Sequence, residues 1–310
     1  SIVSLYDFEN RKGRFAGVHR SYKFCLLTIS SNKVKTPEFA FFLYSLDQLK
    51  QRIRKFNLTF KDINMINPNT KTTPIFRTLL DAEITKLIYR NISIFIKEKT
   101  DHNPWGASFI RMFDMSNDSG LFRTKPSDSS VPLYEDWLIH QYDHRYKSDG
   151  NYIPTKEDKK DKEWLPTPRY WVDYKDFKSR INNYNEYNKN YFIAFRNRTR
   201  STDKRTGIFT IIPRVAAGNP LPLIISGKKP IYDLSLLANF NSIVLDYILC
   251  QKIGGLNLNF FIIKQLPIHQ PDFYSNANIN FIKQRVLELV YTAYDLKPFA
   301  EDMGYDGEPF

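Results

Sequence analysis

The pattern of apolar and polar residues is clearest between residues 191 and 225, where it predicts a strand, a polar loop and a second strand. In the first strand Ile193 and Phe195 share one face, because side chains alternate along an extended chain. The second strand, residues 208–212, is apolar on both faces. We therefore expect it to run through the middle of a sheet.

Elsewhere the pattern predicts a mixture of strands and helices. Strands are expected at residues 2–8, 22–29, 92–96, 170–172 and 259–266, and helices at residues 46–56, 79–90, 173–187, 234–253 and 280–294. Residues 133–145 fit either element, and residues 67–74 and 114–131 are predicted loops. The very polar segment 148–162 is expected to be an exposed, mobile insertion. The predicted fold is α+β: a mixed, largely antiparallel twisted sheet flanked by helices, with a helical C-terminal part.

Two glycines are predicted to end the long apolar helix at residues 234–253. Gly254 and Gly255 follow its last apolar position, and Gly254 is expected at positive φ. Within the predicted helix at 79–90, Ile84, Leu87 and Ile88 are expected to face inward.

Composition narrows the class of partner. The 310 residues are 42% hydrophobic and carry a net charge of +12, which favours a polyanion such as nucleic acid or an acidic membrane surface. No apolar run approaches the roughly 20 residues of a membrane span, and no signal peptide opens the chain. We therefore expect a cytoplasmic protein without a membrane partner. Cys25 and Cys250 lie in apolar segments and are predicted to be buried free thiols.

The strongest candidate chemistry is a row of arginines after the first strand of the 191–225 stretch. Arg196, Arg198 and Arg200 would share one face of an extended chain at a spacing of about 6.7 Å, close to that of neighbouring phosphates. Arginine can bind guanine through two hydrogen bonds, whereas lysine more often contacts phosphate. The candidate DNA-binding residues, in decreasing order of preference, are Arg196, Arg198, Arg200, Ser201, Lys204, Arg205 and Arg214; then Lys71 and Arg77; then Lys12 and Arg14. The alternative is a solvated basic loop on an ordinary domain.

Two short motifs invite comparison with the Asn-Pro-Pro-aromatic loop of DNA amino-methyltransferases, which holds a flipped base. They are Asn67-Pro68-Asn69 and Asn103-Pro104-Trp105. Both lack the second proline, and the sequence has no glycine-rich turn for a nucleotide cofactor. We therefore expect no cofactor site and no methyl-transfer site in these residues.

Metal chemistry has two weak candidates. His140 and His144 would share a face if they lay on a helix, but Gln141 stands where helical zinc proteases have glutamate, so a structural pair is favoured. Magnesium-dependent nucleases use acid-x-Lys triplets, and three occur here: Glu157-Asp158-Lys159, Asp173-Tyr174-Lys175 and Asp176-Phe177-Lys178. Such triplets arise by chance in a chain that is 25% charged. We therefore predict neither a metal site nor a catalytic residue.

The order of segments resembles the C-terminal region of fused type IIG and type ISP restriction–modification proteins. In these proteins a gamma-class N6-adenine DNA methyltransferase is followed by a target-recognition domain. The resemblance covers nearly the whole chain, through the stretches YDFENRKGRF and SYKFCLLTI, NPNTKTTPIFR and DAEITKLIYR, NPWGASFIRMFDMSNDS, PLYEDWLIHQYDHR, PRYW, FRNRTRSTDKRT and IIPR, GNPLPL, LLANFNSIVLDYILCQKIGGLNLNFFIIKQLP, and RVLELVYTAYDLKPFAEDMGYDG.

The resemblance implies three domains. Residues 1–62 would be the tail of a methyltransferase-like domain with a connecting helix, residues 63–233 the target-recognition domain, and residues 234–310 helices that pack on it. The family's S-adenosylmethionine turn and its Asn-Pro-Pro-aromatic motif are expected upstream of Ser1, as is any nuclease with its Mg²⁺ or any helicase. The chain is also expected to continue past Phe310. Family catalysis is therefore carried over to no residue here.

The function expected from this resemblance is sequence-specific binding of double-stranded DNA in bacterial phage defence. The chain would deliver a target adenine to the methyltransferase, and in some cases the nuclease, on the same polypeptide. One alternative is a stand-alone metal-dependent nuclease, which a Mg²⁺-dependent cleavage assay would reveal. Another is a basic module that binds RNA or an acidic protein.

Overall fold

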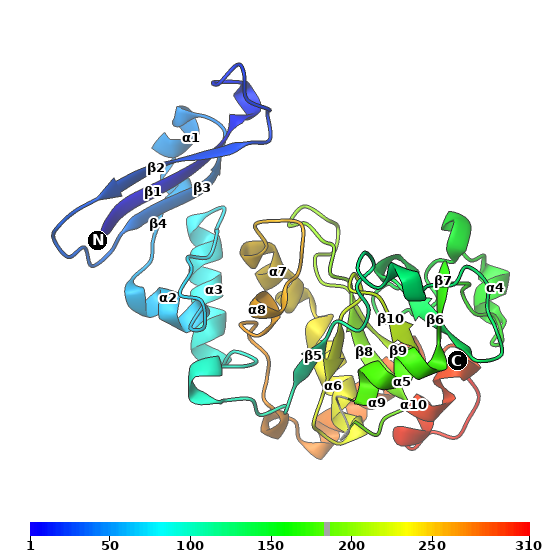
Figure 1. Cartoon of the computed structure of the whole chain (residues 1–310). Coiled ribbons are helices and arrows are strands. Elements are labelled where there is room, and N and C mark those ends of the chain that lie inside the picture. Colours follow the sequence, from blue (N-terminus) through cyan, green and yellow to red (C-terminus); the bar gives the residue numbers. More distant parts are fainter. Residues whose placement is uncertain (183–186) are drawn as a thin grey trace.

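The computed structural model describes residues 1–182 and 187–310. Within these ranges the strands form three sheets, of four, three and four strands, and most strand pairs are antiparallel. Helices flank the sheets and dominate the C-terminal part (Figure 1). The predicted α+β class is confirmed, although the strands are divided among three sheets.

The N-terminal sheet stands apart from the other two (Figure 1). Its strands, in the order β2-β1-β3-β4, are β1 (Ile2–Glu9), β2 (Lys23–Ile29), β3 (Glu38–Leu43) and β4 (Phe56–Asn57). The predicted antiparallel hairpin of β1 and β2 is confirmed, whereas β3, parallel to β1, was not predicted. Cys25 is exposed because it lies on the edge strand β2, so its predicted burial is wrong.

The helix predicted at residues 46–56 is much shorter in the structure than the sequence pattern indicates. Helix α1 (Leu46–Lys50) is followed by a 3-10 turn at Arg52–Arg54. Phe56 belongs to no helix, because it lies in β4 and pairs with Phe39 of β3. Both rings are buried.

Helices α2 (Phe60–Ile66) and α3 (Leu79–Asn91) join the N-terminal sheet to the rest. Helix α2 starts at Thr59, which forms a capping box with Asp62. The predicted inward face of α3 is wrong, since Ile84 and Leu87 are exposed. The helix is instead rotated to bury Ala82, Thr85, Lys86 and Tyr89, and the Tyr89 hydroxyl donates to the Gln265 carbonyl at 2.7 Å.

The central sheet carries the hairpin on which the sequence pattern is clearest. Its strands, in the order β5-β11-β8-β9, are β5 (Ser108–Ile110), β11 (Leu223–Ile225), β8 (Tyr191–Phe195) and β9 (Phe209–Pro213). The hairpin of β8 and β9 is confirmed, but β9 is an edge strand and not an interior one. Its residues are nevertheless buried, because the Phe209 ring stacks on Phe240 and the Asn241 side chain bonds both backbone groups of Phe209.

The third sheet lies beside the central one. Its strands, in the order β10-β6-β7, are β10 (Ala216–Ala217), β6 (Ser130–Tyr134) and β7 (Tyr170–Asp173). Helix α5 (Tyr174–Asn182) follows β7, and the predicted continuation over residues 183–186 lies outside the described residues. The undecided segment 133–145 holds the end of β6, a 3-10 turn at Asp136–Leu138 and irregular chain.

The polar segment at residues 148–162 is docked, so its predicted mobility is wrong. It contains helix α4 (Lys156–Lys160). The buried Arg145 guanidinium donates to the carbonyls of Lys159 and Asp161, and the Lys159 amine bonds Asp143. These contacts hold the segment because each gives a buried or half-buried polar group a hydrogen-bond partner in place of water.

The C-terminal part is helical, as predicted, with different boundaries. It comprises α6 (Pro230–Phe240), α7 (Ile243–Lys252), α8 (Phe260–Ile263), α9 (Asn276–Val290) and α10 (Lys297–Asp302). The helix predicted at 234–253 is two helices at 60°, because Ser242 caps α7 through Leu245 N. The strands predicted at 259–266 and 92–96 are wrong: the first contains α8, and the second makes only an isolated bridge, at Ile94.

Within the described residues, no single helix has both the length and the hydrophobicity of a membrane span; α6 and α7 would pass such a test only as a bent pair. The largest buried cluster draws side chains from β3, β8, β9 and helices α6 to α10. The predicted domain limits at residues 62 and 233 stay a prediction.

Candidate nucleic-acid interface

The loop between β8 and β9 and the segment after β6 enclose an open cavity of 840 Å³. Its lining residues are His140, Gln141, Tyr146, Arg196, Arg198, Thr199, Asp203, Lys204, Arg205 and Ile208. Four of these are lysine or arginine, and among the described residues that line it only Asp203 is acidic. The wall therefore attracts anions. We call it the basic cavity.

Arg196 is bound into the wall of the basic cavity. Its Nε donates to the Asp136 carbonyl at 3.1 Å and its Nη2 donates to the Ile139 carbonyl. Burial lowers the pKa of the Arg196 guanidinium, which the nearby Asp136 charge opposes. Arg196 thus fixes residues 136–139 against the hairpin. The strand pattern had placed it on an open face, and the structure does not.

Arg198 presents a different arrangement. Its Nε and Nη2 each lie 3.0 Å from one carboxylate oxygen of Asp136, which forms a two-point ion pair. The Asp136 side chain is 6% exposed and the Arg198 side chain 63%. A buried carboxylate therefore orients a guanidinium that faces solvent.

The tip of the loop is organised by two aspartates. The Asp203 carboxylate accepts from Arg200 N at 2.9 Å. The Asp246 carboxylate of α7 accepts from Thr206 N and Gly207 N, and lies 3.4 Å from Arg205 Nη1. Arg200 and Lys204 are exposed and Ser201 is half-buried. The loop backbone is thus held while these side chains remain accessible.

The two histidines do not form a shared ligand face. His140 lines the basic cavity, where burial and then the Arg196 charge lower the pKa of its imidazole. His144 is buried and its Nε2 lies 3.0 Å from Asp295 Oδ1. Throughout residues 1–182 and 187–310, no three His, Cys, Asp or Glu side chains are grouped to hold a metal ion.

The remaining predicted DNA-binding residues lie elsewhere. Arg214 follows Pro213, at the opposite end of the hairpin from the loop, and donates to the Lys189 carbonyl at 3.0 Å. Arg77 lies over the Phe42 ring at 4.3 Å, near the N-terminal sheet. Lys71 is exposed on its own loop. Lys12 and Arg14 are exposed in the connection between β1 and β2. The structure therefore gathers Arg196, Arg198, Lys204 and Arg205 at the basic cavity. Arg200 and Ser201 lie in the same loop but do not line the cavity, and the other predicted residues lie apart from it.

Both Asn-Pro motifs use their side chains within the chain. The Asn67 side chain donates to the Thr72 carbonyl at 2.7 Å and accepts from Lys252. The Asn103 side chain bonds both backbone groups of Ala107, and the Trp105 ring is fully buried. Neither motif offers a free amide beside an open aromatic ring, as holding a flipped base requires.

Two of the three acid-x-Lys triplets are likewise occupied, those that contain Asp158 and Asp173. Asp158 caps α4 through Thr155, and Lys159 binds Asp143. Asp173 forms an ion pair with Arg123 at 2.7 Å. Since these acids hold helix starts and strand ends, the geometry does not favour a nuclease centre.

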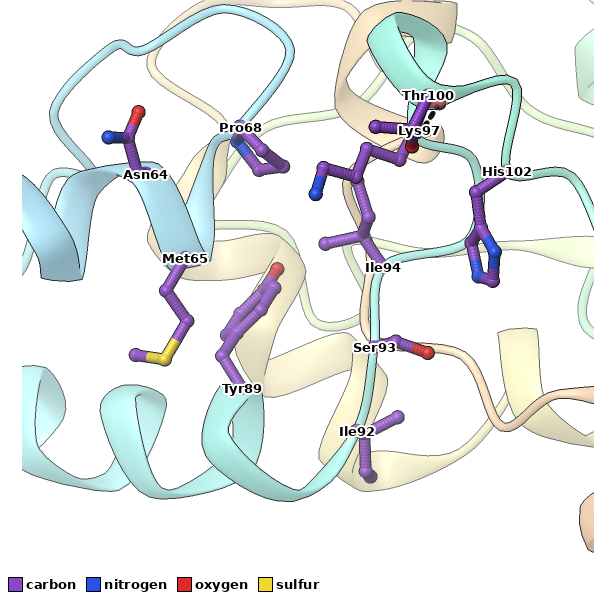
Figure 2. Close-up of a pocket in the computed structure, with 10 residues that line it drawn as sticks. All are labelled: Asn64, Met65, Pro68, Tyr89, Ile92, Ser93, Ile94, Lys97, Thr100 and His102. Atoms are coloured by element: carbon purple, nitrogen blue, oxygen red, sulfur yellow. Dashed lines mark hydrogen bonds between the residues drawn. The ribbon is translucent and has the colours of Figure 1, made fainter.

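A second cavity, of 440 Å³, lies between α2, α3 and the segment at residues 92–102 (Figure 2). Its walls include Met65, Pro68 and Tyr89 on one side and Lys97 and His102 on the other. Figure 2 shows the Lys97 amine extending toward Pro68. This cavity does not adjoin the arginine loop.

Sequence reasoning missed the residue that organises the basic cavity. Asp136 lies 62 positions before Arg198, in the segment whose secondary structure the pattern left open. The only local signal is a charged residue set among Trp137, Leu138 and Ile139. Such an acid needs a partner when it is buried, but the sequence does not say which one.

The solved structures to which the chain is similar include two proteins of known type. Over 98% of this chain and 43% of the other, the chain is similar to the type IIG restriction endonuclease BpuSI, with a TM-score of 0.37 and 11% identity. Over 66% of this chain and 44% of the other, it is similar to the HsdS subunit from Thermoanaerobacter tengcongensis, with a TM-score of 0.26 and 12% identity. No protein-family model and no curated protein matches the sequence.

The chain spans less than half the length of either structure. At these scores neither likeness decides what the chain does. The function must be argued from the residues of the site.

Proposed function

We propose that this chain binds double-stranded DNA at specific sequences, as the target-recognition part of a restriction–modification protein. It presents a target adenine to an N6-adenine methyltransferase on the same polypeptide. S-adenosylmethionine, and Mg²⁺ for any nuclease, bind outside these residues, and catalysis takes place there as well.

The observation that carries the proposal is the basic cavity. Four lysine or arginine side chains line it, and two of them are paired with carboxylates, Arg198 with Asp136 and Arg205 with Asp246. All four come from the loop of a hairpin whose strands are buried. Cations in such numbers provide the sequence-independent attraction to phosphates. An oriented arginine and a tyrosine at the same opening supply groups suited to base edges.

Binding is tested by fluorescence anisotropy with a labelled duplex of mixed sequence, competed by single-stranded DNA, double-stranded RNA and polyglutamate. We expect duplex DNA to compete best. Lys204→Ala should weaken binding several-fold, because it removes an exposed cation from the cavity wall.

Lys178→Ala is the matched control, since Lys178 is an exposed lysine on α5 that does not line the cavity. If RNA or polyglutamate competes as well as duplex DNA, or if the two variants lose affinity equally, the proposal is wrong.

A further inference from the structure

We infer that Arg198 reads a guanine in the major groove and that Asp136 is the positioning residue that holds its guanidinium in the reading orientation. This inference rests on the proposed function, because it assumes that the basic cavity faces duplex DNA. It assigns base reading to Arg198 alone among the cations of the cavity.

The backbone around Arg198 is fixed from two sides. Asn197 N donates to the Pro220 carbonyl at 2.9 Å, and Asn197 O accepts from Leu258 N at 2.7 Å. On the other side Thr199 N donates to the Leu256 carbonyl at 3.0 Å. Arg198 is therefore held between two anchored residues, although the strand itself ends at Phe195.

The ion pair with Asp136 then fixes the side chain. A free arginine on a surface loses rotamer entropy when it is immobilised on a ligand. Here the two-point contact at 3.0 Å has already removed much of that freedom. An arginine oriented before binding loses less entropy for each hydrogen bond that it makes to a base.

The N–H donors of Arg198 that Asp136 does not use match the acceptors on the edge of a guanine. A guanidinium has five N–H donors, on Nε, Nη1 and Nη2. Asp136 takes the Nε proton and one Nη2 proton. Among the remaining three, one on each Nη point outward side by side, which matches the O6 and N7 acceptors of guanine. The exposed side chain can present this pair to a ligand.

A phosphate could accept the same two hydrogen bonds, but the carboxylate argues against it. Asp136 neutralises much of the arginine charge, and phosphate binding depends chiefly on that charge. Base reading depends on direction, which Asp136 improves. Lys204, by contrast, is exposed and suits phosphate, since its ammonium group carries no fixed fork.

The test selects binders from a duplex library with a randomised central segment, using the 310-residue chain as wild type, Arg198→Ala, Arg198→Lys and Arg200→Ala. We expect the wild type to enrich a motif with at least one required guanine. Arg198→Ala should lose the preference at that guanine by roughly 5- to 150-fold. Arg198→Lys should not restore it, because lysine keeps the charge without the fork.

Arg200→Ala is the matched control, since the Arg200 guanidinium has no hydrogen-bond or ion-pair partner among the described residues and does not line the cavity. It should enrich the wild-type motif. Replacing the required guanine by 7-deazaguanine removes the N7 acceptor. This change should weaken the wild type and leave Arg198→Ala unaffected.

The outcomes separate the inference from the function. If the wild type enriches no motif, the proposed function fails. If it enriches a motif that Arg198→Ala enriches equally with uniformly weaker binding, Arg198 is a phosphate contact and the inference is overturned. Asp136→Asn should weaken the preference for guanine at the same position, although Arg198 is still present. Should this buried substitution unfold the protein, the Arg198 variants and the 7-deazaguanine duplex still decide the question.

Discussion

Arginines that are neighbours in sequence have different surroundings in this protein. Arg196 donates to two backbone carbonyls, Arg198 is paired with a buried carboxylate, and Arg200 is exposed. The alternation of the strand predicts one shared face for all three. The structure assigns each a separate environment because Asp136 and Ile139, far away in sequence, approach the hairpin.

Removing Arg196 should therefore destabilise the fold. In Arg196→Ala the carbonyls of Asp136 and Ile139 lose their donors, and we expect the free energy of unfolding to fall by about 1–3 kcal/mol. Arg200→Ala should change it by less than about 0.5 kcal/mol, as at an ordinary surface position. Urea denaturation of both variants measures the difference. Equal midpoints would contradict the structural role of Arg196.

Lys252 gives a prediction about pH. Burial lowers the pKa of its amine to about 7, even though the amine donates to the Ile66 carbonyl at 2.9 Å and lies over the Tyr89 ring. In the unfolded chain a lysine keeps a pKa of about 10.4. Between pH 7 and 10 the unfolded state thus binds more protons, so the free energy of unfolding rises with pH.

In this window we expect the free energy of unfolding of the wild type to rise, relative to that of Lys252→Met, by up to about 1.4 kcal/mol per pH unit. Urea denaturation at pH 7, 8 and 9 tests it, because this range lies between the pKa of Lys252 in the folded protein and that of a lysine in the unfolded chain. A stability difference that stays flat would mean that Lys252 remains charged in the folded protein.

At the scale of elements, local signals set the starts of helices more reliably than their ends or their partners. Thr59 and Thr78 each cap a helix by accepting a hydrogen bond from the backbone N–H three residues later. The break between α6 and α7 depends on Asn241, whose side chain bonds Phe209 at the open edge of β9. Gly254, expected at positive φ, has an ordinary φ, so the chain turns there without needing a glycine conformation.

Gly207 is the glycine that the hairpin loop requires. A Cβ atom at this position would lie 2.6 Å from Leu249 Cδ1 and 3.2 Å from Phe209 Cε2. Its N–H also donates to Asp246 at 2.8 Å, so the loop cannot move away freely. Gly207→Ala should lower the free energy of unfolding by about 1–3 kcal/mol.

Gly255→Ala is the matched control, since nothing lies within 4 Å of a Cβ atom there. Thermal denaturation should show a lower midpoint for Gly207→Ala alone. If the two variants melt together, the close approach of α7 to the loop is not maintained in solution.

For the whole molecule, the net charge of +12 is divided among several parts of the chain. The basic cavity, the loop after α2 and the connection between β1 and β2 are separate patches. A duplex that contacts the cavity and one neighbouring patch meets about five to seven cations. The logarithm of the association constant should then fall against the logarithm of salt concentration with a slope of roughly −5 to −6.

Anisotropy titrations between low and physiological salt measure this slope. A value near zero, or no binding at low salt, would contradict DNA binding altogether. Lys204→Ala should reduce the slope by roughly one unit if Lys204 contacts a phosphate. Arg198→Ala should leave it nearly unchanged if Arg198 contacts a base.

Much of the local structure follows from the sequence by itself. An alternating first strand, an apolar second strand and the polar loop between them predicted the hairpin of β8 and β9, because side-chain period and turn chemistry act over a few residues. The helix start at Thr59 and the candidate arginines of the loop are local signals of the same kind.

Only the tertiary structure decided which arginines face solvent and which are bound. The pairing of Arg198 with Asp136, the capping of β9 by Asn241 and the insertion of β3 beside β1 all join residues distant in sequence. Such contacts form only when the chain has closed around its core, since burial is what obliges a carboxylate or a free strand edge to find a partner.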